Sequence, residues 1–219
     1  MTAGPTREYF DPVRFLSNPS SGKMGYALAR AAAARGWAVE LVSGPVSLPS
    51  PDGVLVEHVV TGEQMYEAVR KRFAQCDILI MTAAIMDYRP KAVADHKIKK
   101  FELEMFIEME PVIDVLATVA REKAHQVVVG FAAETNNMEA YALEKLKSKN
   151  ADFIVANNIG GADGAFGRDE NTVLVFSRQG GQIPLGPLAK DVLADQLLDL
   201  FAPRIVSRDA DLSSNPGQA

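Results

Sequence analysis

The sequence predicts an α/β fold built on a doubly wound, mostly parallel sheet, with a C-terminal β-hairpin and a protruding dimerisation arm or flap. Three short apolar runs, over residues 76–84, 126–133 and 153–156, are each followed by polar or glycine residues and then by helical periodicity. Apolar runs of this length are typical of strands that are buried on both faces of a parallel sheet. Parallel neighbours need crossover connections, so we expect helices on both faces of the sheet.

The remaining elements fit the same alternation. A short first strand ends at Gly4, and a long loop leads to an alanine-rich helix over 25–35 with Gly36 as its C-terminal cap. Further along we expect strands over 38–43 and 54–60, helices over 63–73, 111–122, 138–149 and 190–201, and a β-hairpin with strands over 171–176 and 182–185. This order predicts a Rossmann-like domain over 1–202, followed by a disordered tail over 203–219.

The segment over 91–109 interrupts the alternation. It begins with several lysines, and over 101–109 apolar residues then alternate with acidic ones. This pattern predicts an arm or edge hairpin that serves as a dimer contact or a lid. The lysines either form a solvated face or, in a mobile flap, balance the charge of a polyphosphate; they are Lys91, Lys97, Lys99 and Lys100.

Composition excludes several classes of function. The 219 residues carry 23 Lys plus Arg against 28 Asp plus Glu, a formal charge of -5, so general nucleic-acid binding is not expected. No apolar run approaches the roughly 18 residues that cross a bilayer, so no membrane contact is expected. The chain has one cysteine and no evident leader, which predicts a cytoplasmic protein. The histidines lack metal-ligand spacing, and no nucleophile-histidine pattern is evident, so we expect catalysis by positioning and electrostatics.

The loop before the first helix ends in a pattern that could bind an anion. Free N–H groups and the helix dipole at a helix start attract phosphate, although an N-cap with a surface lysine explains the pattern equally well. A P-loop is not supported, because Ser17 stands where its first glycine belongs and Met24 replaces the Ser or Thr that holds magnesium. The residues at this helix start are Asn18, Ser20, Ser21, Gly22 and Lys23.

Small and acidic residues follow the first of the three apolar runs, at the sheet edge where this class of fold binds ligands. Thr82 and Ala83, the small residues that follow Met81, would let a ligand approach the backbone. Asp87 could hold a ribose or, through water, a magnesium ion, or it could cap the loop with Arg89 as its salt-bridge partner.

Two further strand ends carry candidate ligand contacts. Phe131 could stack on a base or belong to the core. Lys145 and Lys149 are spaced i, i+4 on one helical face, so both could reach one anion, or both could face solvent. Asn157 and Asn158 could read the edge of a base.

Five stretches follow one another in the order AGPTREYFDPVRFLSNPSSGKMG, AAIMDYRP, KIKK, GFAAETNN and ANN. On these stretches the chain resembles the phosphopantothenoylcysteine synthetases over residues 2–201. The resemblance implies a phosphopantothenate-cysteine ligase of coenzyme A biosynthesis. In that family a nucleoside triphosphate, CTP in most bacteria and ATP in eukaryotes, activates the carboxylate of 4′-phosphopantothenate with release of pyrophosphate. Cysteine then displaces the nucleotide from the acyl-nucleotide, an acyl-cytidylate where CTP is used.

The resemblance also implies roles for individual residues. Asn18 resembles the residue that engages the acyl-nucleotide carbonyl, with Arg14 beside it, and Lys97 resembles the lysine of a flexible flap over the triphosphate. Residues 20–23 are weaker candidates for the substrate phosphate, and Asp87 is a candidate ligand of Mg²⁺, the expected cofactor. The implied nucleotide-binding residues are Met81, Thr82, Ala83, Asp87, Lys97, Phe131, Lys145 and Lys149.

The family also implies a homodimer and a phosphopantothenoylcysteine decarboxylase, either fused or separate, and we expect a separate protein or a cut domain here. Met86 stands where the family usually has Ala, and Asn157-Asn158 where it has Asn-Asp, which bears on base recognition; the resemblance implies CTP as the nucleotide, with ATP as the alternative. Two other classes also stay open. An NAD(P)-binding oxidoreductase lacks its glycine fingerprint here, and a nucleotide-binding module without turnover would not need Asn18 and Lys97.

Overall fold

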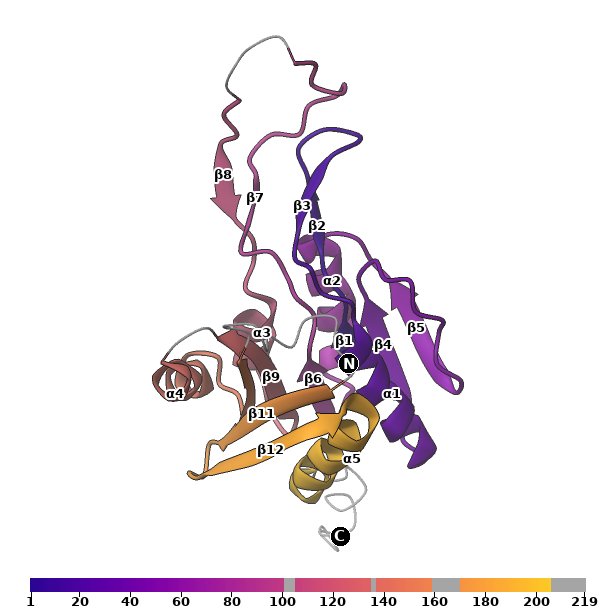
Figure 1. The fold of residues 1–219 in the computed structure, drawn as a ribbon, viewed down its shortest axis with the longest axis vertical. Coiled ribbons are helices and arrows are strands. Elements are labelled where there is room, and N and C mark those ends of the chain that lie inside the picture. The colour runs from indigo at the N-terminus through magenta and orange to yellow at the C-terminus, as the bar shows by residue number, and fades with distance from the viewer. Residues whose placement is uncertain (101–104, 135–136, 159–169, 206–219) are drawn as a thin grey trace, which may run out of the picture.

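The computed structural model describes residues 1–100, 105–134, 137–158 and 170–205, and an eight-stranded sheet forms its centre (Figure 1). Six of the strands are parallel, as the apolar runs predict. The sheet consists of β1 (Thr2–Ala3), β4 (Val39–Ser43), β5 (Val54–His58), β6 (Ile78–Met81), β9 (Val127–Glu134), β10 (Phe153–Asn158), β11 (Glu170–Ser177) and β12 (Gln182–Ala189).

The order of the strands confirms the doubly wound fold. Across the sheet the parallel strands lie in the order β5-β4-β1-β6-β9-β10, so the chain winds outward from β1 and then reverses at β6. Strand β11 pairs antiparallel with β10, and β12 pairs antiparallel with β11, which gives the expected C-terminal hairpin. The topological switch point, where ligands bind in such sheets, therefore lies between β1 and β6.

Helices cover both faces of the sheet and create two apolar cores. Helices α1 (Lys23–Ala34) and α5 (Lys190–Phe201) pack on one face, where Tyr26 and Leu197 are fully buried. Helices α2 (Gly62–Phe73), α3 (Val115–Val119) and α4 (Met138–Ser148) pack on the other. None of the helices in the described ranges is long and apolar enough to span a bilayer.

Helix α1 lies unusually close to the sheet because its first turn contains Gly25. A Cβ atom at Gly25 would lie 2.4 Å from Thr82 Oγ1 and 2.9 Å from the Thr2 carbonyl oxygen. Only glycine fits that contact without a shift of β1 or β6. The start of α1 is thereby fixed against the carboxyl ends of the two strands that flank the switch point.

Two pairs of short strands rise from the carboxyl edge of the sheet (Figure 1). Strands β2 (Arg7–Tyr9) and β3 (Phe15–Ser17) form a hairpin inside the segment that the sequence predicts as a long loop. Strands β7 (Tyr88–Pro90) and β8 (Met109–Pro111) pair with each other at the base of the predicted arm. We call residues 91–108, which connect these two strands, the arm. The figure shows the described part of this arm, residues 91–100 and 105–108, rising beside the β2–β3 hairpin, away from the sheet.

Three predictions of secondary structure need correction or fall partly outside the described residues. The helix predicted over 111–122 begins only at Val115, because Pro111 ends β8 and Asp114 caps the helix; it then tightens into a 3₁₀ turn, η1 (Ala120–Glu122). Residues 105–107 form no strand, and 101–104 lie outside the described residues. Most of the predicted tail, 206–219, also lies outside them, and it follows a second 3₁₀ turn, η2 (Ala202–Arg204).

The packing of α5 predicts a large effect of truncation at Leu197, which is fully buried between the helix and the sheet. Leu197→Ala should lower the free energy of unfolding by about 2–5 kcal/mol, through lost apolar burial and a residual cavity. Urea denaturation measures this change. Val192→Ala, at an exposed position of the same helix, is the control and should change stability by less than about 0.5 kcal/mol. Equal effects of the two variants would contradict this packing.

Candidate functional site

Backbone pairing continues past the ends of β1 and β6, across the switch point. The Ala84 N–H donates to the Gly4 carbonyl (2.9 Å), and the Thr6 N–H donates to the Ala84 carbonyl (3.2 Å). The buried Thr6 hydroxyl accepts the Met86 N–H (3.0 Å). The loop that follows β6 is therefore held by the segment that follows β1, and it cannot move independently of it.

Asn18 joins this pairing from the end of β3. Its side-chain nitrogen Nδ2 donates to the Ala84 carbonyl (3.1 Å) and to the Ile85 carbonyl (3.3 Å). Both amide protons are thus directed at the loop after β6. The side chain is half-buried. It is not among the residues that line the neighbouring cavity, but Ile85, whose carbonyl it contacts, does line that cavity.

This cavity has a volume of about 330 Å³ and opens at the carboxyl edge of the sheet beside the switch point. Its walls come from the loop after β6, the segment from β8 into α3, strands β9 and β10, and helix α4. Six residues that the sequence predicts to bind nucleotide line it together: Met81, Ala83, Asp87, Phe131, Lys145 and Lys149. The structure therefore brings together positions that are up to 68 residues apart, from Met81 to Lys149.

The floor of the cavity is apolar. Gly130 in β9 lets Leu116 and Ile154 close in, since a Cβ atom there would lie 2.7 Å from Leu116 Cδ2 and 2.9 Å from Ile154 Cδ1. Phe131 adds a half-buried aromatic ring. A planar group could lie on this floor, because an aromatic side chain favours stacking and the surrounding aliphatic groups exclude water.

The polar wall carries opposite charges close together. Lys149 Nζ contacts the carboxylate of Asp114, and both residues line the cavity with the exposed Asp87. Burial lowers the pKa of Lys149, and the charge of Asp87 opposes that shift. Lys145 stands one helical turn before Lys149 on the same face, so two ammonium groups converge on one side of the cavity.

Thr82 and the start of α1 lie elsewhere. The Thr82 hydroxyl donates to the Thr2 carbonyl (2.7 Å) and is not among the residues that line the cavity. Gly22, the N-cap of α1, has a φ of 74° and lies against Gly4 and Val46. Among the described residues no side chain caps α1, which starts at Lys23 after Ser20 and Ser21, and phosphate binding at this helix start stays a prediction.

Arg14 and Lys97 both lie away from the cavity. Arg14 is at the tip of the β2–β3 hairpin, where its guanidinium donates to the Asp11 carboxylate and to the Ile98 carbonyl (2.7 Å). Lys97 is exposed and precedes Ile98 in the arm. Neither lines the cavity, and Arg14 is separated from Asn18 by the whole length of β3.

The carboxylate of Asp11 is the centre of these contacts. Burial would raise the pKa of Asp11. The Arg14 guanidinium and the backbone N–H groups of Val13, Arg14 and Ile98 outweigh this effect and hold the pKa well below its usual range. The side chain is fully buried although it lies near the tip of a projecting hairpin.

The described residues fit magnesium only as a partner of phosphate. Within the described ranges no three His, Cys, Asp or Glu side chains gather as a metal cage. Asp87 is an exposed carboxylate at the mouth of the cavity, and Mg²⁺ is commonly held by one or two carboxylates together with substrate phosphates and water. The donor set therefore fits Mg²⁺ that arrives with a polyphosphate.

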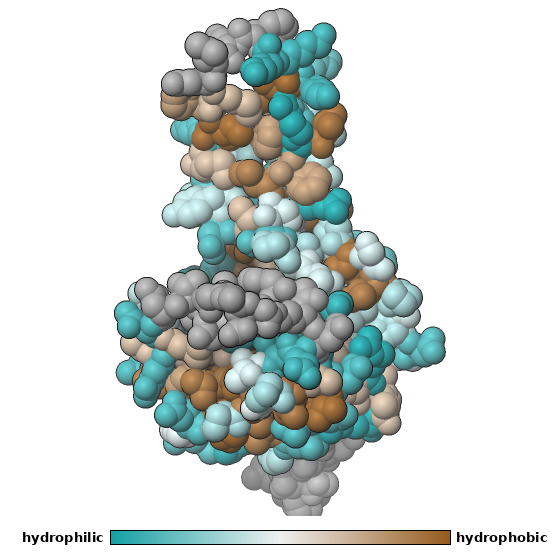
Figure 2. All heavy atoms as spheres, in the orientation of Figure 1, coloured by the Kyte–Doolittle hydropathy of each residue, from teal (hydrophilic) through white to brown (hydrophobic). Residues whose placement is uncertain are grey.

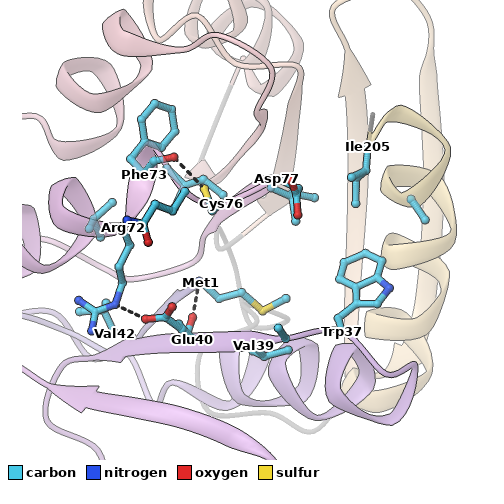
Figure 3. Close-up of a pocket in the computed structure, with 16 residues that line it drawn as sticks. Met1, Trp37, Val39, Glu40, Val42, Arg72, Phe73, Cys76, Asp77 and Ile205 are labelled. Atoms are coloured by element: carbon cyan, nitrogen blue, oxygen red, sulfur yellow. Dashed lines mark hydrogen bonds and ion pairs between the residues drawn. The ribbon is translucent and has the colours of Figure 1, made fainter. Parts of the chain in front are cut away.

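A second cavity, of about 520 Å³, lies at the opposite edge of the sheet, where β4 and β6 begin (Figure 3). Its polar groups are largely satisfied by one another: the Met1 nitrogen donates to the Glu40 carbonyl (2.7 Å), Arg72 pairs with the Glu40 carboxylate (2.5 Å), and Cys76 donates to the Phe73 carbonyl (3.3 Å). Ligands of doubly wound sheets bind at the carboxyl edge, so we assign function to the smaller cavity.

One prediction about an individual side chain is wrong, and another stays a prediction. Arg89 pairs with Glu110 (2.8 Å) and Glu63 (2.9 Å), across the β7–β8 ladder and toward α2, and not with Asp87 as the sequence suggested. Asn157 has a buried Oδ1 atom with no hydrogen-bond partner in the described part of the chain. The side chain of Asn158 lies outside the described residues.

Sequence reasoning missed three residues that shape the site. Asp114 both caps α3, by accepting the Ala117 N–H (2.9 Å), and pairs with Lys149. An Asp directly before Val-Leu-Ala is an N-cap pattern that could have marked it. Thr6 and Asp11 act through contacts with residues about 80 positions away, Met86 and Ile98, which no local pattern reveals.

Comparisons with known proteins agree with this arrangement. Residues 1–204 match the model of the DNA/pantothenate metabolism flavoprotein C-terminal domain. The chain is 46% identical over 204 residues to the coenzyme A biosynthesis bifunctional protein CoaBC of Bacillus subtilis (strain 168), covering 92% of this chain and 50% of that protein. It is 48% identical over 202 residues to CoaBC of Escherichia coli (strain K12), covering 90% and 49%. The chain thus spans about half the length of these curated relatives.

Solved structures share the fold. The C-terminal domain of a CoaBC protein superposes with a TM-score of 0.78 at 41% identity, covering 98% of this chain and 94% of that one. A Cab2 mutant in complex with phosphopantothenate-cysteine gives a TM-score of 0.76 at 15% identity, covering 97% and 87%. The family match over residues 1–204 and the identity to two CoaBC proteins show that this chain belongs to the family of the DNA/pantothenate metabolism flavoprotein C-terminal domain.

Proposed function

We propose that the chain is a CTP-dependent phosphopantothenoylcysteine synthetase, which joins 4′-phosphopantothenate and L-cysteine. The observation that carries the proposal is the convergence of Asp87, Phe131, Lys145 and Lys149 on one cavity in a chain of this family. The names of the CoaBC relatives support a role in coenzyme A biosynthesis. A ligase product, phosphopantothenate-cysteine, is bound by a Cab2 mutant that shares the fold, which also supports the proposal.

The first step is activation of the carboxylate. A carboxylate oxygen of 4′-phosphopantothenate attacks the α-phosphorus of CTP, the bond to pyrophosphate breaks, and an acyl-cytidylate forms. Lys145 and Lys149 supply positive charge on one wall of the cavity, and Phe131 offers a face for the cytosine. Magnesium, held by Asp87 and the triphosphate, would add further charge neutralisation.

The second step is attack by cysteine. Its amino group attacks the acyl carbon, CMP leaves with the former carboxylate oxygen, and the amine loses a proton. The amide protons of Asn18 are held by the Ala84 and Ile85 carbonyls, and Ile85 lines the cavity. For Asn18 to stabilise the developing oxygen charge, one of these protons turns from the backbone carbonyl to the reacting carbonyl.

Pyrophosphate release tests the proposed function directly. The chain should release pyrophosphate when CTP, 4′-phosphopantothenate and magnesium are all present, because activation precedes cysteine attack. Omission of cysteine should leave at most one turnover, and addition of cysteine should make release catalytic. Replacement of CTP by ATP should lower the rate. Pyrophosphate release with ATP but not with CTP would contradict the proposed use of CTP. The absence of release from a folded chain would favour a nucleotide-binding module without turnover.

Asn18→Asp should separate the two steps. The carboxylate cannot donate, so acyl-cytidylate formation should persist while attack by cysteine slows by about 100-fold, the usual loss for one donor to a developing oxyanion. Rapid-quench mass spectrometry should then detect accumulated acyl-cytidylate, with the wild-type chain as the reference. A fall in overall turnover without any accumulated intermediate would show that Asn18 does not act in the second step.

We also propose that the chain is a homodimer joined through the arm. Hydrophobic side chains gather among hydrophilic ones on the projecting part of the molecule (Figure 2). In the described part of the arm, Val93, Met105 and Phe106 are 56%, 47% and 89% exposed. Large apolar side chains at this exposure mark an interaction surface. Because Lys97 lies on the same arm and does not line the cavity of its own chain, the dimer would bring Lys97 to the cavity of its partner.

Phe106→Asp tests this interface. Analytical ultracentrifugation of the wild-type chain should give twice the chain mass of 23.7 kDa. The dimer dissociation constant of the variant should be at least about tenfold higher than that of the wild-type chain, because a charged side chain replaces an apolar one at the interface. Val192→Asp, at an exposed position of α5, is the control and should dimerise normally. A monomeric wild type, or an unchanged Phe106→Asp variant, would contradict the proposed arm interface.

The remaining expectations follow from the proposed activity. We propose that a phosphopantothenoylcysteine decarboxylase, which consumes the product of this reaction, works with this chain as a fused or separate unit. The bifunctional names of the CoaBC relatives support this proposal. The substrates are water-soluble metabolites, so we propose a cytoplasmic location. An NAD(P)-dependent oxidoreductase is disfavoured because the connection from β1 to α1 contains the β2–β3 hairpin in place of a short glycine-rich turn.

A further inference from the structure

Asp11 is a buried charge that the proposed mechanism does not use. Its side chain is fully buried, yet it lies in the tip of the β2–β3 hairpin and outside the ligand cavity. A buried carboxylate is unfavourable unless hydrogen bonds and an opposite charge compensate for the lost water. The groups that hydrogen-bond to the Asp11 carboxylate therefore indicate its role in the structure.

The two carboxylate oxygens have different partners. Oδ1 accepts the N–H groups of Val13 (2.9 Å) and Arg14 (2.8 Å), which closes the turn of the hairpin. Oδ2 accepts from the Arg14 guanidinium at 2.9 Å and 2.5 Å, and from the Ile98 N–H at 3.1 Å. One oxygen thus serves the hairpin, and the other reaches across to the arm.

The contact with the arm falls on the peptide that follows Lys97. The N–H of Ile98 belongs to the Lys97–Ile98 peptide group, and Asp11 accepts it. The Ile98 carbonyl accepts from the Arg14 guanidinium (2.7 Å), and the Ala94 N–H donates to the Phe10 carbonyl (3.1 Å). The backbone on both sides of Lys97 is therefore held by the hairpin tip, while the Lys97 side chain stays exposed.

The hairpin does not depend on Asp11 to stay attached to the body. At its base Glu8 accepts the Gly62 N–H (2.8 Å), Arg7 N–H donates to the Val60 carbonyl (2.8 Å), and the Ser17 hydroxyl donates to the Thr6 carbonyl (2.7 Å). These contacts hold the hairpin on helix α2 and on the segment after β1. Asp11 is not part of this attachment; besides closing the turn, its carboxylate adds the contact with the arm.

We propose that Asp11 is a positioning residue that acts through Arg14 and the Ile98 peptide to fix the backbone of Lys97 for the activation step. This inference rests on the proposed function of Lys97. Charge-assisted hydrogen bonds in a buried setting are stronger than neutral ones, so the Asp11–Arg14 pair limits the positions that Lys97 can reach. A long lysine side chain then meets the triphosphate from a fixed anchor, which lowers the entropy lost on closure.

Asp11→Asn removes the arm contact and keeps the turn. An asparagine can still accept the Val13 and Arg14 N–H groups through Oδ1, whereas its Nδ2 group is a donor and opposes the guanidinium and the Ile98 N–H. Glu8→Gln is the matched control, because it also removes a buried carboxylate from the same hairpin but keeps its acceptor for Gly62.

Tryptic cleavage after Lys97 measures the anchor without any need for activity. A protease must pull the Lys97–Ile98 peptide out of its contacts, so cleavage under native conditions reports local opening. Mass spectrometry should show cleavage at this bond at least about tenfold faster in Asp11→Asn than in the wild-type chain or in Glu8→Gln. Equal cleavage in all three proteins overturns the proposal.

Single-turnover kinetics then measure the consequence. Asp11→Asn should lower the rate of acyl-cytidylate formation by about 10- to 100-fold, with Lys97→Gln as the benchmark, and should leave cysteine attack on preformed acyl-cytidylate unchanged. Glu8→Gln should leave both rates unchanged. An unimpaired first step in Asp11→Asn, beside an impaired Lys97→Gln, overturns the link between anchor and chemistry. A wild-type chain without pyrophosphate release overturns the proposed function instead, and the tryptic comparison still decides whether Asp11 fixes Lys97.

Discussion

The pairing of the segment after β1 with the loop after β6 is the constraint on which the site depends. In a doubly wound sheet the crevice at the switch point is open because adjacent chains diverge there. Here Gly4, Thr6, Ala84 and Met86 continue the pairing and bridge that crevice. The ligand cavity lies to one side, between the end of β6 and the positions of Phe131 in β9 and Ile154 in β10. Asn18 also contacts this bridge, because its side-chain amide donates to the Ala84 and Ile85 carbonyls in the loop after β6.

The residues of the proposed reaction lie on two parts of the molecule, the sheet domain and the projecting arm. The cavity is built from elements that pack on the sheet, and its charged groups neutralise one another through Asp87, Asp114 and Lys149 before any ligand enters. Lys97 is carried by the arm, where Asp11 holds the neighbouring peptide. A polyphosphate would exchange the carboxylate partners of the lysines for phosphate oxygens. That exchange favours the ligand because a triphosphate offers more negative charge than the carboxylates it displaces.

The sequence predicts what depends on local pattern and misses what depends on distant contacts. Strands β6, β9 and β10 were predictable because burial on both faces leaves a continuous apolar run. Six cavity residues were predictable because they resemble a family motif or follow these strands. The β2–β3 hairpin was missed, since its strands are short and half-exposed. The bond between Asp11 and Ile98 spans 87 positions, and such a contact leaves no periodic signal.

The long connection from β1 to α1 explains how a dinucleotide-type topology can serve a different chemistry. A short glycine turn would place the helix N-terminus directly on the ligand phosphates in the crevice. Here the bridged crevice separates the start of α1, beside Gly4 and Gly22, from the cavity lined by Lys145 and Lys149. The proposed reaction would use this separation: each of its two phosphorylated substrates needs its own counter-charge, while the reacting carboxylate and α-phosphate must come together.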